Sequence, residues 1–198
     1  MMQMDATNAL KNKLDTMRPL NQDRILLLWP QWRAEDALFV YATNAVEGST
    51  LTLGETLAVL EYGVTVSGKP LSEHLDAVNG QKAYSAMLDL AQKRAKIGLE
   101  TVLDLHRTIV GDVPYGGQLR HERLVDEMLA RYDKGMSNGE HPIRVASTLH
   151  FDLLTIHPFK DGNGRTARLL ENLHLIREGF VPILIGPEEK PRYFDVLQ

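Results

Sequence analysis

Apolar residues recur along most of this chain at intervals of three and four residues, the spacing that gathers side chains on one face of an α-helix. No stretch shows a convincing strict alternation of the kind that marks a half-buried strand. The pattern therefore predicts an all-α fold, a compact bundle of about seven or eight helices. The main predicted helices cover residues 34–47, 52–62, 72–94, 99–110, 124–132, 142–156 and 164–178.

Capping residues mark several of the predicted helix boundaries. Thr52 and Glu55 have the T-x-x-E form of a capping box, in which each side chain accepts from the other residue's backbone N–H. Ser72 is suited to cap the long helix that follows it. Pro142 suits a first helical turn, and Pro158 cannot continue the helix before it. Two helices are therefore predicted to meet at the short loop around Pro158.

The first 33 residues carry fewer helical signals than the rest of the chain. We interpret residues 1–33 as an N-terminal helical extension that precedes one domain over residues 34–198. The last six residues, YFDVLQ, read like the beginning of a helix, so we expect the natural protein to continue beyond them.

Composition and charge narrow the classes of function. The 198 residues are 43% hydrophobic and 24% charged, as in ordinary globular domains. The net charge of −4 gives no electrostatic footprint for nucleic acid. Without cysteine the chain has no disulfide, thiolate metal site or cysteine nucleophile. The N-terminus does not resemble a signal peptide, and the apolar runs are too short to span a bilayer. We therefore expect a cytoplasmic protein with no membrane and no nucleic-acid partner.

Residues 157–168, HPFKDGNGRTAR, concentrate the candidate chemistry at the predicted loop between two helices. The glycines let backbone N–H groups converge on an anion, and the start of a helix adds unpaired donors. Arg165 and Arg168 are three residues apart on one helical face, and guanidinium groups bind phosphate oxygens bidentately. Asp161 suits a magnesium ion that bridges phosphate oxygens, and His157 can accept a proton from a hydroxyl. The stretch therefore predicts attack of a hydroxyl on a nucleotide phosphate.

Two other interpretations fit this part of the chain less well. GNGRTA has the G-x-G-x-x-A spacing of a dinucleotide fingerprint, but that fingerprint follows a strand, and here a predicted helix precedes it. His141, His150 and His157 do not have a recognised zinc-ligand spacing.

HPFKDGNGRTAR resembles the Fic signature, H-x-F-x-D/E-G-N-G/K-R-x-x-R, at every fixed position. The segments HPIRVASTLHFDLLTI, LLENLHLIREGFVP, GGQLR and RYFDVL are also similar to Fic domains, so the resemblance covers about residues 36–198. It implies the Fic fold, a helical bundle around a helix-loop-helix active site. It also implies transfer of AMP from ATP to a Ser, Thr or Tyr hydroxyl of a target protein.

The resemblance implies a role for each residue of the signature. His157 would be the general base, Asp161 would hold Mg²⁺, and Phe159 would anchor the loop in the core. Gly162, Asn163 and Gly164 would form a backbone cradle for the α- and β-phosphates of ATP. Arg165 would bind near the β-phosphate, and Arg168 would bind the γ-phosphate.

Residues 43–49, TNAVEGS, resemble the S/T-x-x-x-E-G/N inhibitory motif that precedes many Fic domains, an arrangement of the class II type. The matching residues are Thr43, Glu47 and Gly48. The resemblance implies that Glu47, in an inhibitory helix over about 34–47, pairs with Arg168 in place of the γ-phosphate. ATP would then bind with its phosphates misplaced, which can lower a rate by a large factor. We therefore expect autoinhibition within one chain.

Many Fic domains also have a β-hairpin flap that docks the target by strand addition. In this chain Arg120 is followed almost at once by a predicted helix, so we expect the flap to be shortened or absent. The alternatives to an AMP-transferase are removal of AMP, use of another phosphate-containing donor, and a non-catalytic nucleotide-binding module. The target protein and the formation of a homodimer are left open.

Overall fold

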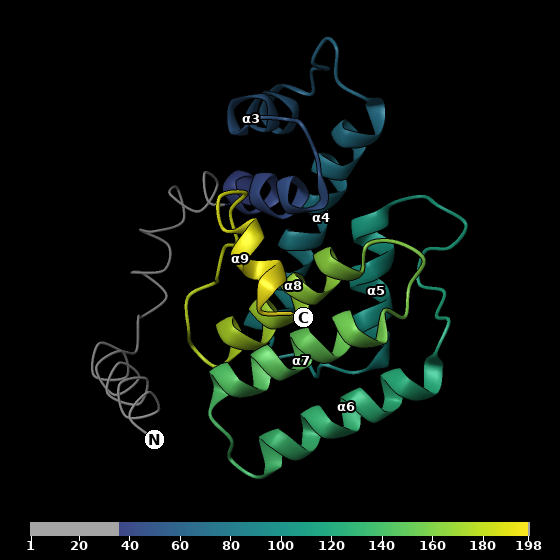
Figure 1. Cartoon of the computed structure of the whole chain (residues 1–198), viewed down its shortest axis with the longest axis vertical. Coiled ribbons are helices and arrows are strands. Elements are labelled where there is room, and N and C mark those ends of the chain that lie inside the picture. The colour runs from purple at the N-terminus through teal and green to yellow at the C-terminus, as the bar shows by residue number, and fades with distance from the viewer. Residues whose placement is uncertain (1–35, 198) are drawn as a thin grey trace. The chain divides into compact units, whose positions relative to one another are not determined.

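The computed structural model describes residues 36–197, and all regular secondary structure in this range is helical (Figure 1). The predicted extension over residues 1–33 lies outside the described residues. Eight helices and no strand occur within 36–197, so the prediction of an all-α fold is confirmed. None of these helices is long and apolar enough to cross a membrane. A helix over 36–47 is followed by α3 (Leu53–Tyr62), α4 (Leu71–Gln92), α5 (Leu99–Val110), α6 (Glu122–Ser137), α7 (Pro142–Ile156), α8 (Asn163–Arg177) and α9 (Lys190–Asp195).

The helix α8 is the centre of the bundle. It packs against α4, α5 and α7, and α6 packs on α7 (Figure 1). Leu169, Leu170 and Leu173 of α8 are fully buried in the main hydrophobic cluster. Twelve of the fifteen residues of α8 are buried, including two arginines, a glutamate and a histidine. Because buried polar groups are costly without partners, each of these side chains needs a partner from another segment.

The local signals located some helix boundaries and missed others. The capping box is present: the Thr52 N–H donates to Glu55 Oε2 at 2.7 Å, and the Glu55 N–H donates to Thr52 Oγ1 at 3.2 Å. The prediction that Ser72 caps the next helix was wrong, since α4 begins at Leu71 and Pro70 is its N-cap. The helix α6 continues to Ser137, past the predicted end, because its apolar face continues against α7.

The segment between α5 and α6 forms turns and no hairpin within the described residues, as predicted for a chain without a full flap. It is tied to the loop after α7 at two points. The Arg120 N–H donates to the Pro158 carbonyl at 2.8 Å. The Gly117 N–H donates to His106 Nδ1 at 2.8 Å, and the other ring nitrogen of His106 faces the same loop.

Candidate functional site

The loop of the signature joins two helix ends. The helix α7 ends at Ile156, and His157 follows as its C-cap in the left-handed region, with φ 50°. The histidine side chain is exposed, at the mouth of a cavity. The helix α8 begins at Asn163, and Gly162 is its N-cap with φ 75°, a conformation that glycine adopts without a steric penalty. The predicted helix-loop-helix arrangement is therefore present.

Phe159 fixes the loop to the core. Its ring is fully buried and stacks on the ring of His106, with centroids 3.6 Å apart. The Asn163 side chain holds the Phe159 backbone from both sides: its Oδ1 accepts from the Phe159 N–H and its Nδ2 donates to the Phe159 carbonyl, both at 2.9 Å. The Asn163 amide is therefore engaged within the loop. The side-chain amide is therefore not available to a phosphate. The backbone N–H of Asn163 remains available, because the N–H groups of the first helical turn have no partner within the helix.

His106 is a site residue whose role the sequence did not reveal. Its Nε2 donates to the Asp161 carbonyl at 2.9 Å and its Nδ1 accepts from Gly117, so the ring is a neutral tautomer with one proton. Burial lowers the pKa of His106, which keeps the ring neutral. A buried histidine on an apolar helix face was the available signal, and it indicated only a core position.

The structure brings the two sequence motifs together at Arg168. Arg168 Nε donates to Thr43 Oγ1 at 2.7 Å, and Nη2 donates to the Thr43 carbonyl at 3.1 Å. The same Nη2 lies 2.6 Å from Glu47 Oε1. The Arg168 side chain is 4% exposed and the Glu47 side chain is 41% exposed, so the buried cation meets a carboxylate that water still reaches. Gly48 follows the helix with φ 107° and turns the chain away.

The Glu47 carboxylate also lies against the first turn of α8. A methyl group in place of the Gly164 hydrogen would collide with Glu47 Oε1 and approach Arg168 Nη1 to 3.2 Å. The start of a helix attracts anions because its N–H groups are unpaired and its dipole is positive there. Glu47 therefore occupies a place suited to a phosphate oxygen, and Gly164 leaves room for it.

Arg165 is paired with carboxylates as well. Its Nη1 lies 2.5 Å from Asp76 Oδ1 of α4, and its Nη2 lies 3.6 Å from Asp161 Oδ2. The side chain of Asp161 is largely exposed and accepts from the Gly162 N–H at 2.7 Å. Asp76 is a second residue that sequence reasoning missed, since a single aspartate on a helix carries no local signal.

The carboxylate of Asp161 fits a magnesium site that is completed by substrate. Mg²⁺ in nucleotide sites takes one or two protein carboxylates, and phosphate oxygens and water supply the other ligands. Within residues 36–197 no group of three or more metal-ligating side chains could hold a metal ion without such help. An exposed carboxylate beside Arg165 and the start of α8 is compatible with an ion that arrives with phosphates.

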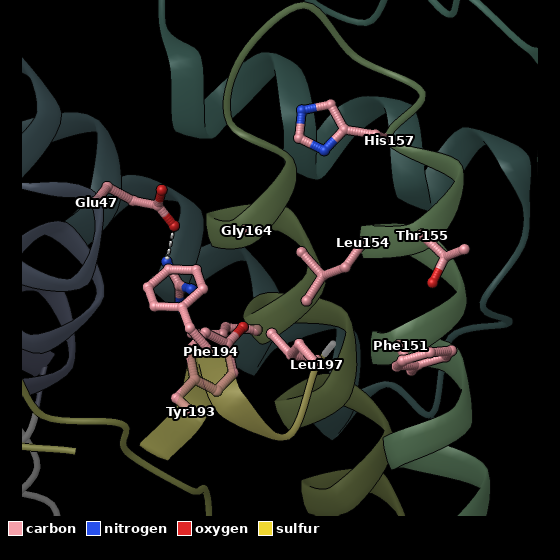
Figure 2. Close-up of a pocket in the computed structure, with 10 residues that line it drawn as sticks. Glu47, Phe151, Leu154, Thr155, His157, Gly164, Tyr193, Phe194 and Leu197 are labelled. Carbon is pink, nitrogen blue, oxygen red and sulfur yellow. Dashed lines mark hydrogen bonds and ion pairs between the residues drawn. The ribbon is translucent and has the colours of Figure 1, made fainter. Parts of the chain in front are cut away.

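Two cavities lie on either side of Glu47. One has a volume of about 270 Å³ and is lined by His157, Gly164 and Arg168 together with side chains of α7 and of the C-terminal segment (Figure 2). The other has a volume of about 250 Å³ and is lined by Asp161 and Arg165 together with polar residues of α4 and of the segment over 44–49. Glu47 lines both. The two arginines of the signature thus line different cavities, and the Glu47 carboxylate lies between them.

Residues 96–175, from just before α5 to near the end of α8, match the model of the Fic/DOC family. The chain is 35% identical to the protein adenylyltransferase fic-1 of Caenorhabditis briggsae over 179 aligned residues. The alignment covers 79% of this chain and 35% of that protein. It is 33% identical to the protein adenylyltransferase Fic of Culex quinquefasciatus over 189 aligned residues, and this alignment covers 84% of this chain and 38% of that protein. The chain therefore spans little more than a third of these relatives.

Solved structures resemble the fold over nearly the whole chain. A Fic domain-containing signaling protein from Bacteroides thetaiotaomicron aligns with a TM-score of 0.85 at 25% identity, covering 96% of this chain and 79% of that chain. Fic-1 from C. elegans aligns with a TM-score of 0.82 at 30% identity, covering 98% of this chain and 61% of that chain.

Proposed function

Because this chain belongs to the Fic/DOC family, we propose that it is a protein adenylyltransferase, which transfers AMP from ATP to a hydroxyl side chain of a target protein. We further propose that the state described here is autoinhibited, with Glu47 in the place of the γ-phosphate. The observation that carries this proposal is the 2.6 Å contact between Glu47 and the buried Arg168 guanidinium.

In the proposed reaction the hydroxyl oxygen of a Ser, Thr or Tyr of the target attacks the α-phosphorus of ATP. The bond from the α-phosphorus to the bridging oxygen breaks, and pyrophosphate leaves. His157 accepts the hydroxyl proton, a role supported by its exposed position at the cavity that Gly164 and Arg168 also line. Preorganised donors at the start of α8 would stabilise the charge that develops on the phosphates.

The remaining residues of the signature would position the nucleotide. Arg168 would bind the γ-phosphate after Glu47 withdraws, and Arg165 would bind the β-phosphate region. Asn163 and Gly164 would offer backbone N–H groups to the α- and β-phosphates, and Gly162 would join them once its N–H, which here donates to Asp161, is released. Asp161 would hold Mg²⁺ together with phosphate oxygens, and the ion would supply neutralising charge.

Autoinhibition follows from the position of Glu47 between the cavities. A triphosphate that reached both arginines would have to pass the start of α8, where the carboxylate now lies. While Glu47 stays, the phosphates are forced aside, and a misplacement of about 1 Å at the reacting atoms can cost about 100-fold in rate.

The proposal is tested by label transfer from ATP that carries ³²P at the α-position. Wild type, Glu47→Gly, His157→Ala and the double variant are each incubated with Mg²⁺ in a cell lysate. Labelled bands are expected with Glu47→Gly, weaker ones with wild type and none with either His157→Ala form, and mass spectrometry then identifies the target. Nucleotide binding without transfer by Glu47→Gly would instead support a non-catalytic nucleotide-binding module.

A further inference from the structure

The short helix α9 lies beside the cavity of Arg168 but has no residue of its own in the core. Its six residues, Lys190–Asp195, include none that is buried. Nevertheless Tyr193 and Phe194 of α9 and the following Leu197 line the cavity (Figure 2). A helix this short is not stable by itself, so its position depends on contacts with the rest of the domain.

Tyr193 makes such a contact with a buried polar pair. Its hydroxyl oxygen lies 2.8 Å from His150 Nε2, and the two rings meet edge to face at 80°. On the far side of the imidazole, His150 Nδ1 lies 2.7 Å from Glu171 Oε2, at an angle that falls short of a linear hydrogen bond. His150 in α7 and Glu171 in α8 are both buried.

The chemistry of the three groups gives the chain of contacts a direction. A carboxylate only accepts, so the nitrogen that faces Glu171 carries a proton, and in the neutral tautomer with that proton Nε2 accepts from the Tyr193 hydroxyl. Tyr193 is half-buried, and the loss of solvent around its hydroxyl raises its pKa against the opposing effect of the Arg168 guanidinium, which keeps the hydroxyl protonated as a donor.

Tyr193 also faces Arg168. The guanidinium carbon lies 6.0 Å from the centroid of the tyrosine ring, at the limit of a cation–π contact. The contacts therefore run from Glu171 in the core through His150 and Tyr193 to Arg168. The neighbour of Glu171 on α8, Asn172, holds the segment before α9, since its amide exchanges hydrogen bonds of 2.7 and 3.0 Å with the Ile183 backbone.

We propose that Tyr193, seated on the buried His150–Glu171 pair, is a positioning residue that docks α9 as one wall of the nucleotide site and steadies the Arg168 guanidinium. This inference rests on the proposed function in one respect, that the nucleotide enters the cavity of Arg168. His150 and Glu171 do not line that cavity and act through Tyr193, while Tyr193 touches Arg168 rather than the reacting atoms. Loss of the contact is therefore expected to weaken nucleotide binding and to spare the chemical step.

The kinetic test is made in the Glu47→Gly background, where transfer is measurable. Tyr193→Phe keeps the ring and removes the hydroxyl, and it should raise the KM for ATP about 3- to 10-fold, the effect of one hydrogen bond, with kcat within about twofold. Glu171→Gln should raise the KM in the same direction. The KM of the double variant should be no higher than that of the single variant with the higher KM, because both changes break the same chain of contacts.

Tyr62→Phe is the matched control, since Tyr62 is 75% exposed in α3 and lines neither cavity. Its KM and kcat should equal those of the parent. A fall in kcat at unchanged KM in Tyr193→Phe, or strictly additive effects of the two changes, would overturn the positioning role.

A second measurement separates this inference from the proposed transferase activity. Amide hydrogen exchange of residues 190–197 without nucleotide should be several-fold faster in Tyr193→Phe than in the parent, while exchange in α8 is unchanged. If Glu47→Gly transfers no label, calorimetric titration with ATP replaces the KM. Weaker ATP binding and faster exchange in Tyr193→Phe would then support the positioning role while the transferase proposal fails. Unchanged exchange or unchanged ATP affinity would overturn it.

Discussion

Substitution of Glu47 by glycine tests the central contact of this protein most directly. The change removes the carboxylate that lies 2.6 Å from Arg168 and against Gly164, and it leaves the two Thr43 contacts of Arg168 in place. Arg168 and the start of α8 would then both be available to an incoming phosphate. We therefore expect tighter ATP binding and faster transfer.

The size of the effect follows from the burial of the two partners. Exposed ion pairs contribute up to about 1 kcal/mol, and hydrogen bonds to charged groups contribute about 1.5–3 kcal/mol. The Arg168 side chain is 4% exposed and the Glu47 side chain 41%, so the pair falls between these cases at about 1–3 kcal/mol. Because ATP has to displace this contact, its loss should tighten ATP binding by about 5- to 150-fold.

The assay is calorimetric titration of each variant with ATP and Mg²⁺, combined with the initial rate of label transfer. Glu47→Gln is the matched variant, since it keeps the size of the side chain and one oxygen acceptor but removes the charge, and it should give an intermediate affinity. Without nucleotide, Glu47→Gly should also unfold more easily, because the buried Arg168 loses its counter-charge. Wild-type ATP affinity and rate in both variants would refute the reasoning.

Three further predictions concern the scaffold of the site. Burial, with a smaller effect of the Arg177 guanidinium, lowers the pKa of His174 to about 4, so the stability due to its neutral ring is complete above the unfolded pKa of about 6.5 and is lost as pH falls towards 4. Urea unfolding at pH 7 and pH 4.5 should show a loss of about 2 kcal/mol that is largely absent in His174→Gln, and equal losses would contradict the assignment. Phe159→Ala should lower the free energy of unfolding by about 3–5 kcal/mol because the ring is fully buried, and a loss below about 1 kcal/mol in the same assay would show that the loop does not depend on it. Asp76→Asn should raise the Mg²⁺ concentration for half-maximal transfer about 3- to 10-fold, since the freed Arg165 would pair with Asp161, and an unchanged Mg²⁺ dependence would exclude this role.

Local signals in the sequence predicted much of the fold because they act within a few residues. The capping box of Thr52 and Glu55, Pro142 in the first turn of α7, and the end of α7 before Pro158 are each decided by neighbouring backbone groups. The same signals were misleading at Ser72, where the preceding proline already starts the helix. The first half of the signature was predicted as a tight loop and its second half as the start of a helix, and the structure has a loop over 157–162 and α8 from Asn163.

The roles of the signature residues were inferred from the resemblance to Fic domains and stay predictions. The residues that contact them were decided by the packing of the helices. The sequence spacing of Arg165 and Arg168 predicts a shared helix face, but Asp76 and Asp161 hold one guanidinium and Thr43 and Glu47 hold the other. These partners come from α4, the loop and the first described helix.

The sequence by itself therefore determined most of the helices, several of their boundaries and the stretch of residue types suited to binding phosphate. The Glu47–Arg168 pair was expected from the resemblance, whereas the tertiary structure alone paired Arg165 with Asp76 and placed His150, Glu171 and Tyr193 in one chain of contacts across α7, α8 and α9. The physical reason is the burial of α8 on nearly all sides. Its polar side chains cannot be satisfied by water, so their partners are set by whichever helices pack around them, at sequence distances that no local pattern records.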